Sequence, residues 1–170
     1  MRKIFTAMDA PPTKLDKHER NFVANVREHG WLGTHVAAGD TGSEFSYTTG
    51  FWLKFEAPEL IVYSLRGKVA HDTFWHAYRE LATGKRFLVG EPTDDFFGNV
   101  AAVLLPVSSR HYRIHFGWSR WFYGNDDFQC LQLFWADRDG RFPWSPGASD
   151  GLRQAQPDLT NGGWPGLRDR

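Results

Sequence analysis

Four side chains have the chemistry of a small acid–base site. His71 falls in the first turn of an expected helix, and Glu59 starts the expected strand before it. An imidazole and a carboxylate perform general acid–base chemistry near neutral pH when they lie within hydrogen-bond reach. Tyr47 and Asp137 add a hydroxyl and a second carboxylate. These four residues form a candidate catalytic set, and the competing interpretation is that each is structural, with Asp137 placed by turn chemistry.

A second candidate site is an aromatic cleft. Trp, Phe and Tyr make up 16% of the chain, a surplus that fills either a bulky core or a lined cavity. Gln132 lies in the apolar run 128–135, where its amide needs partners from a ligand or from neighbouring backbone. Both interpretations of Gln132 stay open. The expected ligand-binding residues are Trp31, Tyr47, Thr49, Trp52, Gln132, Trp135 and Trp144.

A basic and aromatic segment runs from Arg110 to Arg120. Arg113 and Tyr112 are typical of its interleaved cations and rings, and residues 108–124 contain no acid. Such a pattern binds single-stranded nucleic acid or other anions. It also describes an amphipathic helix with a solvated basic face. We favour the helix because the chain is neutral as a whole, and we expect no nucleic-acid partner.

The sequence signals neither a metal nor a cofactor. His111 and His115 are four residues apart, which suits two rings on one helix face, but a zinc site needs three or four ligands. Cys130 lies among apolar residues, a poor setting for a thiolate nucleophile. The glycine motifs of nucleotide-binding loops and the nucleophile elbow of hydrolases are missing from the sequence.

Length and composition predict one soluble domain. The chain has 170 residues, 20 basic and 20 acidic side chains, and a single cysteine. Its length supports a sizeable core, and neutrality argues against a dedicated nucleic-acid binder. A lone cysteine suits a reducing compartment, and no apolar stretch approaches a membrane span. We therefore expect a cytoplasmic protein with no membrane partner; its oligomeric state stays open.

Hydrophobic periodicity predicts alternating helices and strands. Helices are expected at residues 14–29, with Thr13 as N-cap and Gly30 as terminator, and at residues 70–81. A third, short helix is favoured at residues 111–123. Strands are expected at residues 31–37, 44–52, 59–65, 86–89, 100–107 and 128–135.

These elements predict an α+β fold in a single domain. A mostly antiparallel sheet would carry two or three helices, within an α+β domain at residues 1–142. Residues 143–170 are rich in proline and glycine, which predicts an irregular C-terminal tail that packs on the domain or is partly disordered. Trp144 and Trp164 would pin that tail to the body.

Several phrases of the sequence have the form of family signatures. Two of them are Phe45-Ser-Tyr-Thr-Thr-Gly-Phe51 and Ala57-Pro-Glu-Leu-Ile-Val62, and His29-Gly-Trp31 precedes them. They resemble the opening signature and the preceding motif of a bacterial family, domain-of-unknown-function family 4262. Leu131 to Trp144 resembles a later block, and Gln156-Pro157 its last motif. Ser64 stands where the family often has glycine. The resemblance implies a shared fold and recurring residues, and it implies no particular activity.

Two main hypotheses of function follow. The first is a non-catalytic binding domain whose aromatic cleft takes a small molecule or a partner protein, with an immunity or regulatory role as a subtype. The second is a small acid–base enzyme, for example a hydrolase, that uses His71 and a nearby carboxylate. A flavin- or nucleotide-binding barrel is a third. Proximity of His71 to Glu59 would discriminate between the first two.

Overall fold

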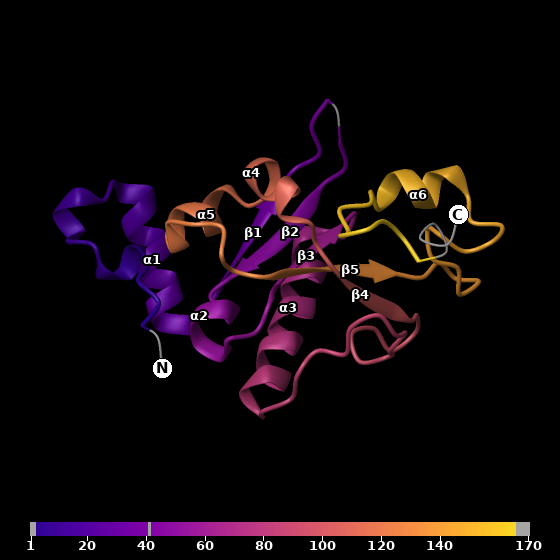
Figure 1. The fold of residues 1–170 in the computed structure, drawn as a ribbon, viewed down its shortest axis with the longest axis horizontal. Helices are drawn as coiled ribbons and strands as arrows, with labels where there is room; N and C mark the ends of the chain where they lie inside the picture. The colour runs from indigo at the N-terminus through magenta and orange to yellow at the C-terminus, as the bar shows by residue number, and fades with distance from the viewer. Residues whose placement is uncertain (1–2, 41, 166–170) are drawn as a thin grey trace.

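The protein is built around a five-stranded mixed sheet (Figure 1). The computed structural model of the chain describes residues 3–40 and 42–165. The strands are β1 (Leu32–Val36), β2 (Phe45–Thr49), β3 (Glu59–Tyr63), β4 (Ala102–Pro106) and β5 (Cys130–Trp135). Their order is β1-β2-β3-β5-β4, and β3 pairs with β5 in parallel while the other neighbours are antiparallel. The expected α+β class with a mostly antiparallel sheet is confirmed.

Helices cover both faces of this sheet (Figure 1). The α-helices are α1 (Lys17–His29), α2 (Phe51–Phe55), α3 (Gly67–Ala82), α4 (Tyr112–His115), α5 (Gly117–Tyr123) and α6 (Asp150–Ala155). Short 3-10 turns are η1 (Ala7–Asp9), η2 (Pro12–Lys14) and η3 (Ser109–His111). On one face, α3 packs on apolar side chains of β3, β4 and β5. On the other, α1, α4 and α5 form a second core that is rich in aromatic rings.

Alternation along β3 assigns its side chains to the two cores. Leu60 and Val62 pack in the core beneath α3, whereas Ile61 and Tyr63 pack in the core beneath α4 and α5. All five residues of β3 are buried, as expected for a central strand covered on both sides. The α3 core contains Phe74 and Trp31, and the opposite core contains Phe22 and the rings of the basic and aromatic segment.

The first helix begins later than the sequence suggested. Asp16, rather than Thr13, is its N-cap: Oδ1 of Asp16 accepts from the Glu19 N–H, and Oε2 of Glu19 accepts from the Asp16 N–H, both at 2.8 Å. This reciprocal pair satisfies two amide groups of the first turn, an advantage that Thr13 does not have. Gly30 ends the helix with φ 84°, as expected.

The predicted return strand 44–52 was wrong in its last three residues. β2 ends at Thr49, and the chain turns at Gly50 with φ 123° into α2. A Cβ at Gly50 would lie 2.5 Å from the Gly30 carbonyl oxygen and 2.8 Å from the Trp31 Cα. Only glycine therefore allows the two chain segments to approach this closely.

The predicted strand at residues 86–89 was also wrong. The outer edge of β4 instead forms backbone hydrogen bonds with a later part of the loop before it. There the Gly90 N–H donates to the Leu104 carbonyl at 2.9 Å, and Thr93 forms a β-bridge with Ala102. In the tail, composition did not predict α6, which Ser149 caps by accepting the Leu152 N–H at 3.0 Å. Trp144 and Trp164 lie beside Phe134 and Phe142 in a third apolar cluster.

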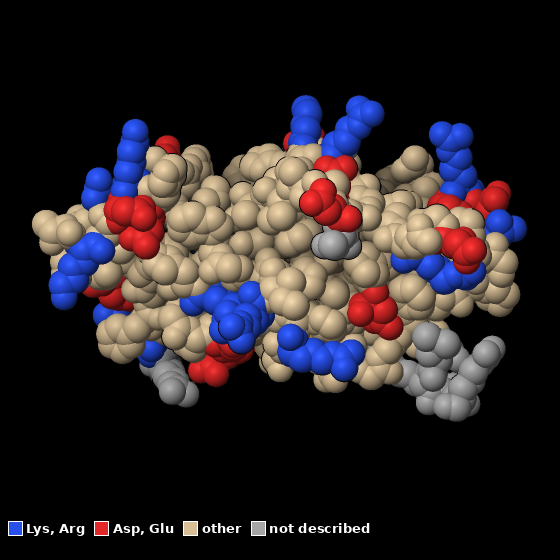
Figure 2. Space-filling model, turned by 90° about the horizontal axis from the view of Figure 1, so that it is seen from above, with Lys and Arg blue, Asp and Glu red and all other residues tan. Residues whose placement is uncertain are grey.

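On the face drawn in Figure 2, basic and acidic side chains are interspersed, and neither charge sign forms a large patch. Such interspersion is consistent with 20 charges of each sign. Among the described residues, no helix has both the length and the apolar character to cross a membrane.

Candidate functional site

Glu59 is fully buried and is surrounded by hydrogen-bond donors. Oε1 accepts from the Tyr123 hydroxyl at 2.5 Å and from the N–H groups of Gly50 and Trp52 at 2.9 and 3.1 Å. Oε2 accepts from the Thr48 hydroxyl at 2.6 Å and from an α2 amide at 3.3 Å. The carboxylate therefore joins the start of β3 to the N-terminus of α2, where a negative group is favoured.

Burial raises the pKa of Glu59, while hydrogen bonds from Thr48, Tyr123 and the α2 amides act in the opposite direction. With no exposed surface and with five donors on its two oxygens, the carboxylate has no free position for a substrate. Its geometry is that of a structural buried acid whose polar atoms are satisfied.

The candidate catalytic set is not brought together. Glu59 reaches Tyr123 of α5, whereas His71 lies on α3 and stacks on Trp31 with ring centroids 5.3 Å apart. Leu60, which alternates with Glu59, is the residue that points toward α3. The expected pairing of His71 with Glu59 is therefore corrected: strand alternation directs the carboxylate away from the helix that carries the imidazole.

The other two candidate catalytic residues have local structural partners. The Tyr47 hydroxyl accepts from the Trp118 N–H at 3.1 Å, and burial raises the pKa of this phenol. Oδ1 of Asp137 accepts from the N–H groups of Asp139 and Arg141 at 2.9 and 2.8 Å, which closes the turn after β5. Asp137 is thus occupied by the turn chemistry that the sequence offered as its alternative.

The residues expected to line an aromatic cleft also lie in different parts of the structure. Trp31 and Trp135 pack in or against the α3 core, Tyr47 and Trp52 in or against the opposite core, and Trp144 against the tail cluster. These rings do not line one cavity because strand alternation and helix packing distribute them over two faces and one end of the sheet. The Thr49 hydroxyl bonds to the Ser119 hydroxyl at 2.7 Å inside the protein.

Gln132 fixes the C-terminal segment to the sheet. Its Nε2 donates to the Pro157 carbonyl at 2.7 Å, and its Oε1 accepts from the Leu159 N–H at 3.1 Å. Gln156, also fully buried, bonds both ways with the Trp135 backbone at 2.9 Å. Of the two interpretations of Gln132, the structure shows the one with backbone partners.

A groove between β1 and α3 is the hollow with the clearest binding character. It consists of two adjoining cavities of about 310 and 220 Å³ that share Gly33 and His71, and we call it the β1–α3 groove. The larger cavity is lined by Asn25, His29, Trp31, Leu32, Gly33, His71 and Trp75. The smaller is lined by Gly33, Thr34, His35, Ser46, Gly67, His71 and Phe74.

Aromatic rings form one wall of the β1–α3 groove. Trp75, which is 37% exposed, stacks on Trp31 at 5.9 Å and on Tyr78 at 5.2 Å between ring centroids. His71 stacks on the same Trp31 ring. The Trp31 Nε1–H is buried and has no hydrogen-bond partner in the described structure. A buried unpaired donor costs about 1–3 kcal/mol. Among the described residues, the Trp164 Nε1–H in the tail cluster is the other such donor.

Most of the chain matches one known protein family. A family model described as "Domain of unknown function (DUF4262)" matches residues 25–149. The chain belongs to this family. No curated protein and no solved structure matches it. The resemblance proposed from the DUF4262 signature phrases is thereby confirmed, and it brings no activity with it.

In this DUF4262 chain, the two phrases of the opening signature fold around the buried acid. Thr48 and Gly50 of the first phrase bind the carboxylate of Glu59, which belongs to the second. Ser64 has φ 57°, a backbone conformation that glycine adopts without strain. These two phrases thus surround a structural acid, whereas Ser46 of the first phrase and His29 and Trp31 of the preceding motif line the β1–α3 groove.

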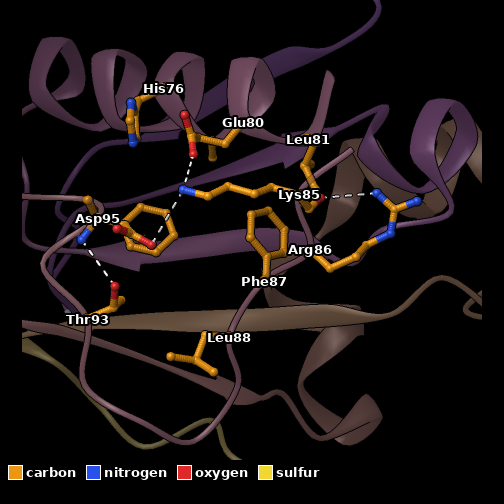
Figure 3. Close-up of a pocket in the computed structure, with 11 residues that line it drawn as sticks. His76, Glu80, Leu81, Lys85, Arg86, Phe87, Leu88, Thr93 and Asp95 are labelled. Carbon is orange, nitrogen blue, oxygen red and sulfur yellow. Dashed lines mark hydrogen bonds and ion pairs between the residues drawn. The ribbon is translucent and has the colours of Figure 1, made fainter. Parts of the chain in front are cut away.

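Two further hollows are less suited to a specific ligand. The pocket in Figure 3 lies under α3 and has a volume of about 30 Å³, which holds little more than water. Lys85 lies there between Glu80, to which it bonds closely, and Asp95 at 4.0 Å. A broad depression of about 1030 Å³ is walled by residues 3–5, Trp52 and Tyr123, with mixed charge.

The basic and aromatic segment packs as an amphipathic helical unit. Its rings Tyr112, Phe116 and Phe122 are buried in the core, and Arg120 pairs with Asp126 at 2.6 Å. The aromatic side chains are therefore not available as a stacking surface for bases. Ile114 is the strongly exposed apolar side chain of this segment, with 80% of its surface accessible to solvent.

His111, His115 and Cys130 have structural surroundings. The His115 Nδ1 lies 2.9 Å from the His111 carbonyl, and burial lowers the pKa of both imidazoles. Burial also raises the pKa of the Cys130 thiol, which suppresses the thiolate form. Within residues 3–40 and 42–165, no group of three or more histidine, cysteine or acidic side chains has the arrangement of a metal site.

Sequence reasoning missed most of the β1–α3 groove. Of the candidate residues, Trp31 and His71 line it, and they came from separate hypotheses. Trp75 was missed because it lies one turn beyond His71 on α3, where an aromatic residue fits an ordinary helix face. One signal was present: Trp75 follows Phe74 directly, so two large rings in succession cannot both face the core of one helix.

Proposed function

We propose that the protein is a binding domain that takes its ligand or partner in the β1–α3 groove and performs no chemistry on it. The observation that carries this proposal is a pair of adjoining cavities whose wall includes an accessible ring, Trp75, stacked on the buried ring of Trp31. Apolar hollows with a few polar groups are the usual form of binding sites. The groove offers rings for packing and imidazoles at His29 and His71 for polar contacts.

The chemistry of the buried groups supports binding over catalysis. Glu59 has its oxygens occupied by donors, and the Cys130 thiol is buried with a raised pKa. The buried lone cysteine also fits a reducing, cytoplasmic setting, and the family resemblance favours a bacterial one. We extend the proposal to a partner protein or a small aromatic molecule as occupant, including an immunity or regulatory role.

A fluorescent aromatic anion, 8-anilinonaphthalene-1-sulfonate, tests this proposal on the full chain. We expect native protein to enhance its emission and Trp75→Ala to weaken binding at least about 5-fold, a loss of about 1 kcal/mol. Ile114→Ser is the matched control, because it removes the most exposed apolar side chain on the opposite face and should leave binding unchanged. Equal binding by the wild type and Trp75→Ala would overturn the proposal.

A further inference from the structure

The two edge strands of the sheet differ in how far other segments pair with their outer backbone groups. On the outer side of β4, Gly90 donates to Leu104 and Thr93 bridges to Ala102, so the loop before β4 covers part of that edge. β1 pairs with β2 alone, and no other described strand pairs with it. Every second residue of an edge strand points its N–H and C=O groups away from the sheet, and such an edge is a template for another chain.

The β1–α3 groove runs along this unpaired edge. Gly33 of β1 forms its floor: a Cβ there would lie 3.4 Å from the Trp31 ring, 3.7 Å from Phe74 and 4.0 Å from the His71 Nδ1. On the helix side, Trp75 is 37% exposed and Val69 is 44% exposed. Because strand side chains alternate, a chain laid against β1 would direct every second side chain toward these α3 residues.

The charge around the groove fits a negatively charged occupant. None of its lining residues is Asp or Glu, and three are histidine. α3 begins there at Gly67, after Arg66, with no capping side chain and no acid in its first turn. Two of these histidines already lie beside acids, His35 beside Glu44 at 3.2 Å and His29 beside Glu28 at 3.6 Å, and Asp72 pairs with Lys68 at 2.8 Å. A carboxylate on the occupant would therefore meet little repulsion and a favourable helix dipole.

We propose that an extended, carboxylate-bearing peptide segment of a partner protein adds to β1 as a sixth strand. In this arrangement the main chain of the peptide pairs with Leu32–Val36, an apolar side chain packs on Trp75, and a carboxylate lies toward the start of α3. Main-chain pairing supplies affinity and the groove supplies specificity, as in other cases of strand addition. The proposal rests on the proposed function of the groove and names the class of partner.

A phage-displayed library of random octapeptides, selected on the full chain, supplies the probe. We expect the selected sequences to carry acidic residues and an apolar anchor. We also expect Trp75→Ala and Gly33→Val each to weaken the binding of a synthetic selected peptide at least 10-fold. Gly33→Val fills the floor of both cavities on a strand that favours valine. Ile114→Ser is again the control, because it lies outside the groove.

N-methylation of the peptide, one residue at a time, tests the main-chain pairing. An added strand donates to its neighbour from every second residue, so alternate methyl groups should weaken binding about 10-fold or more and the others should have little effect. Amide exchange within β1 should slow when the peptide binds. Insensitivity to every methyl group would overturn the proposal, even where the aromatic probe still binds the groove.

The oligomeric state provides a second test of the occupant. If the full chain alone dimerises in sedimentation and Gly33→Val is a monomer, the occupant of the edge is a second copy and the peptide proposal fails. A monomeric wild-type chain with alternating N-methyl sensitivity supports it. If 8-anilinonaphthalene-1-sulfonate also fails to bind, the proposed function fails together with the peptide.

Discussion

Two polar regions of this protein differ in how far their polar groups are satisfied. Around Glu59, a fully buried carboxylate receives donors from β2, α2 and α5. In the β1–α3 groove, the indole N–H of Trp31 is unpaired, a tryptophan ring is open to solvent, and the neighbouring strand edge has no partner strand. Both regions contain residues with catalytic chemistry, but the Glu59 carboxylate is fully buried, whereas the groove leaves room for another molecule.

The difference separates structural polar groups from available ones. A buried acid can resemble a catalytic residue, but donors that occupy both oxygens hold it in a structural role. An incomplete set of contacts at the surface indicates a site that a partner completes. The comparison therefore predicts large stability effects at Glu59 and large binding effects with small stability effects in the groove.

Glu59→Gln is the substitution with the largest expected effect on stability. An amide group in place of one carboxylate oxygen would face backbone N–H donors and leave them unpaired, at about 1–3 kcal/mol for each donor. We expect a loss of about 3–5 kcal/mol, or roughly 10 °C in Tm, measured by thermal and urea unfolding. Glu56→Gln, an exposed position nearby, is the control and should leave Tm unchanged. Equal Tm values for the two variants would contradict a structural role for Glu59.

Trp75→Ala tests the prediction that substitutions in the β1–α3 groove have small effects on stability. Because this ring is 37% exposed, we expect a loss of about 1 kcal/mol, or roughly 2–4 °C in Tm. Phe74→Ala is a matched control at the adjacent position of α3, where the ring is buried, and should cost about 3–5 kcal/mol. If Trp75→Ala destabilised the protein as much as Phe74→Ala, the ring would be part of the core rather than of a binding wall.

The smallest expected effect is a pH dependence that arises outside both regions, at His115. Burial lowers the pKa of this imidazole in the folded protein below its ordinary value of 6.5, so the unfolded chain binds the proton more readily. Stability should therefore fall as pH decreases through about 6.5. We expect His115→Gln to reduce, by about 2 °C or less, the difference in Tm between about pH 7.5 and 5.5. An unchanged difference would assign the pH dependence to other groups.

Local elements were predictable because short-range rules govern them. The apolar run at Glu59–Tyr63 indicated a central strand, and the helical spacing from Ala70 to Leu81 indicated α3. The strand past Thr49 was predicted wrongly because the turn at Gly50 depends on a close approach to Gly30 and on the Glu59 carboxylate, both distant in sequence. Phe51 and Trp52 favour strands by type, so tertiary contacts overrode local preference.

The candidate site depended even more on long-range contacts. The sequence offered His71 and Trp31 as separate candidates, and only the packing of α3 on the edge of the sheet made them neighbours. The same sequence offered Glu59 as a partner for His71, and strand alternation separated the two. Residue types show which chemistry is available, but they do not show which groups meet across a sheet.

By itself, the amino-acid sequence determined the α+β class, the family and the positions of most strands and helices, because periodicity and capping act over a few residues. The tertiary structure alone decided that Glu59 is a satisfied structural acid and that Trp75 stands at an open groove. The physical reason is that burial and hydrogen-bond satisfaction depend on groups brought together from distant parts of the chain. An edge strand becomes recognisable as an edge only when the whole sheet order is known.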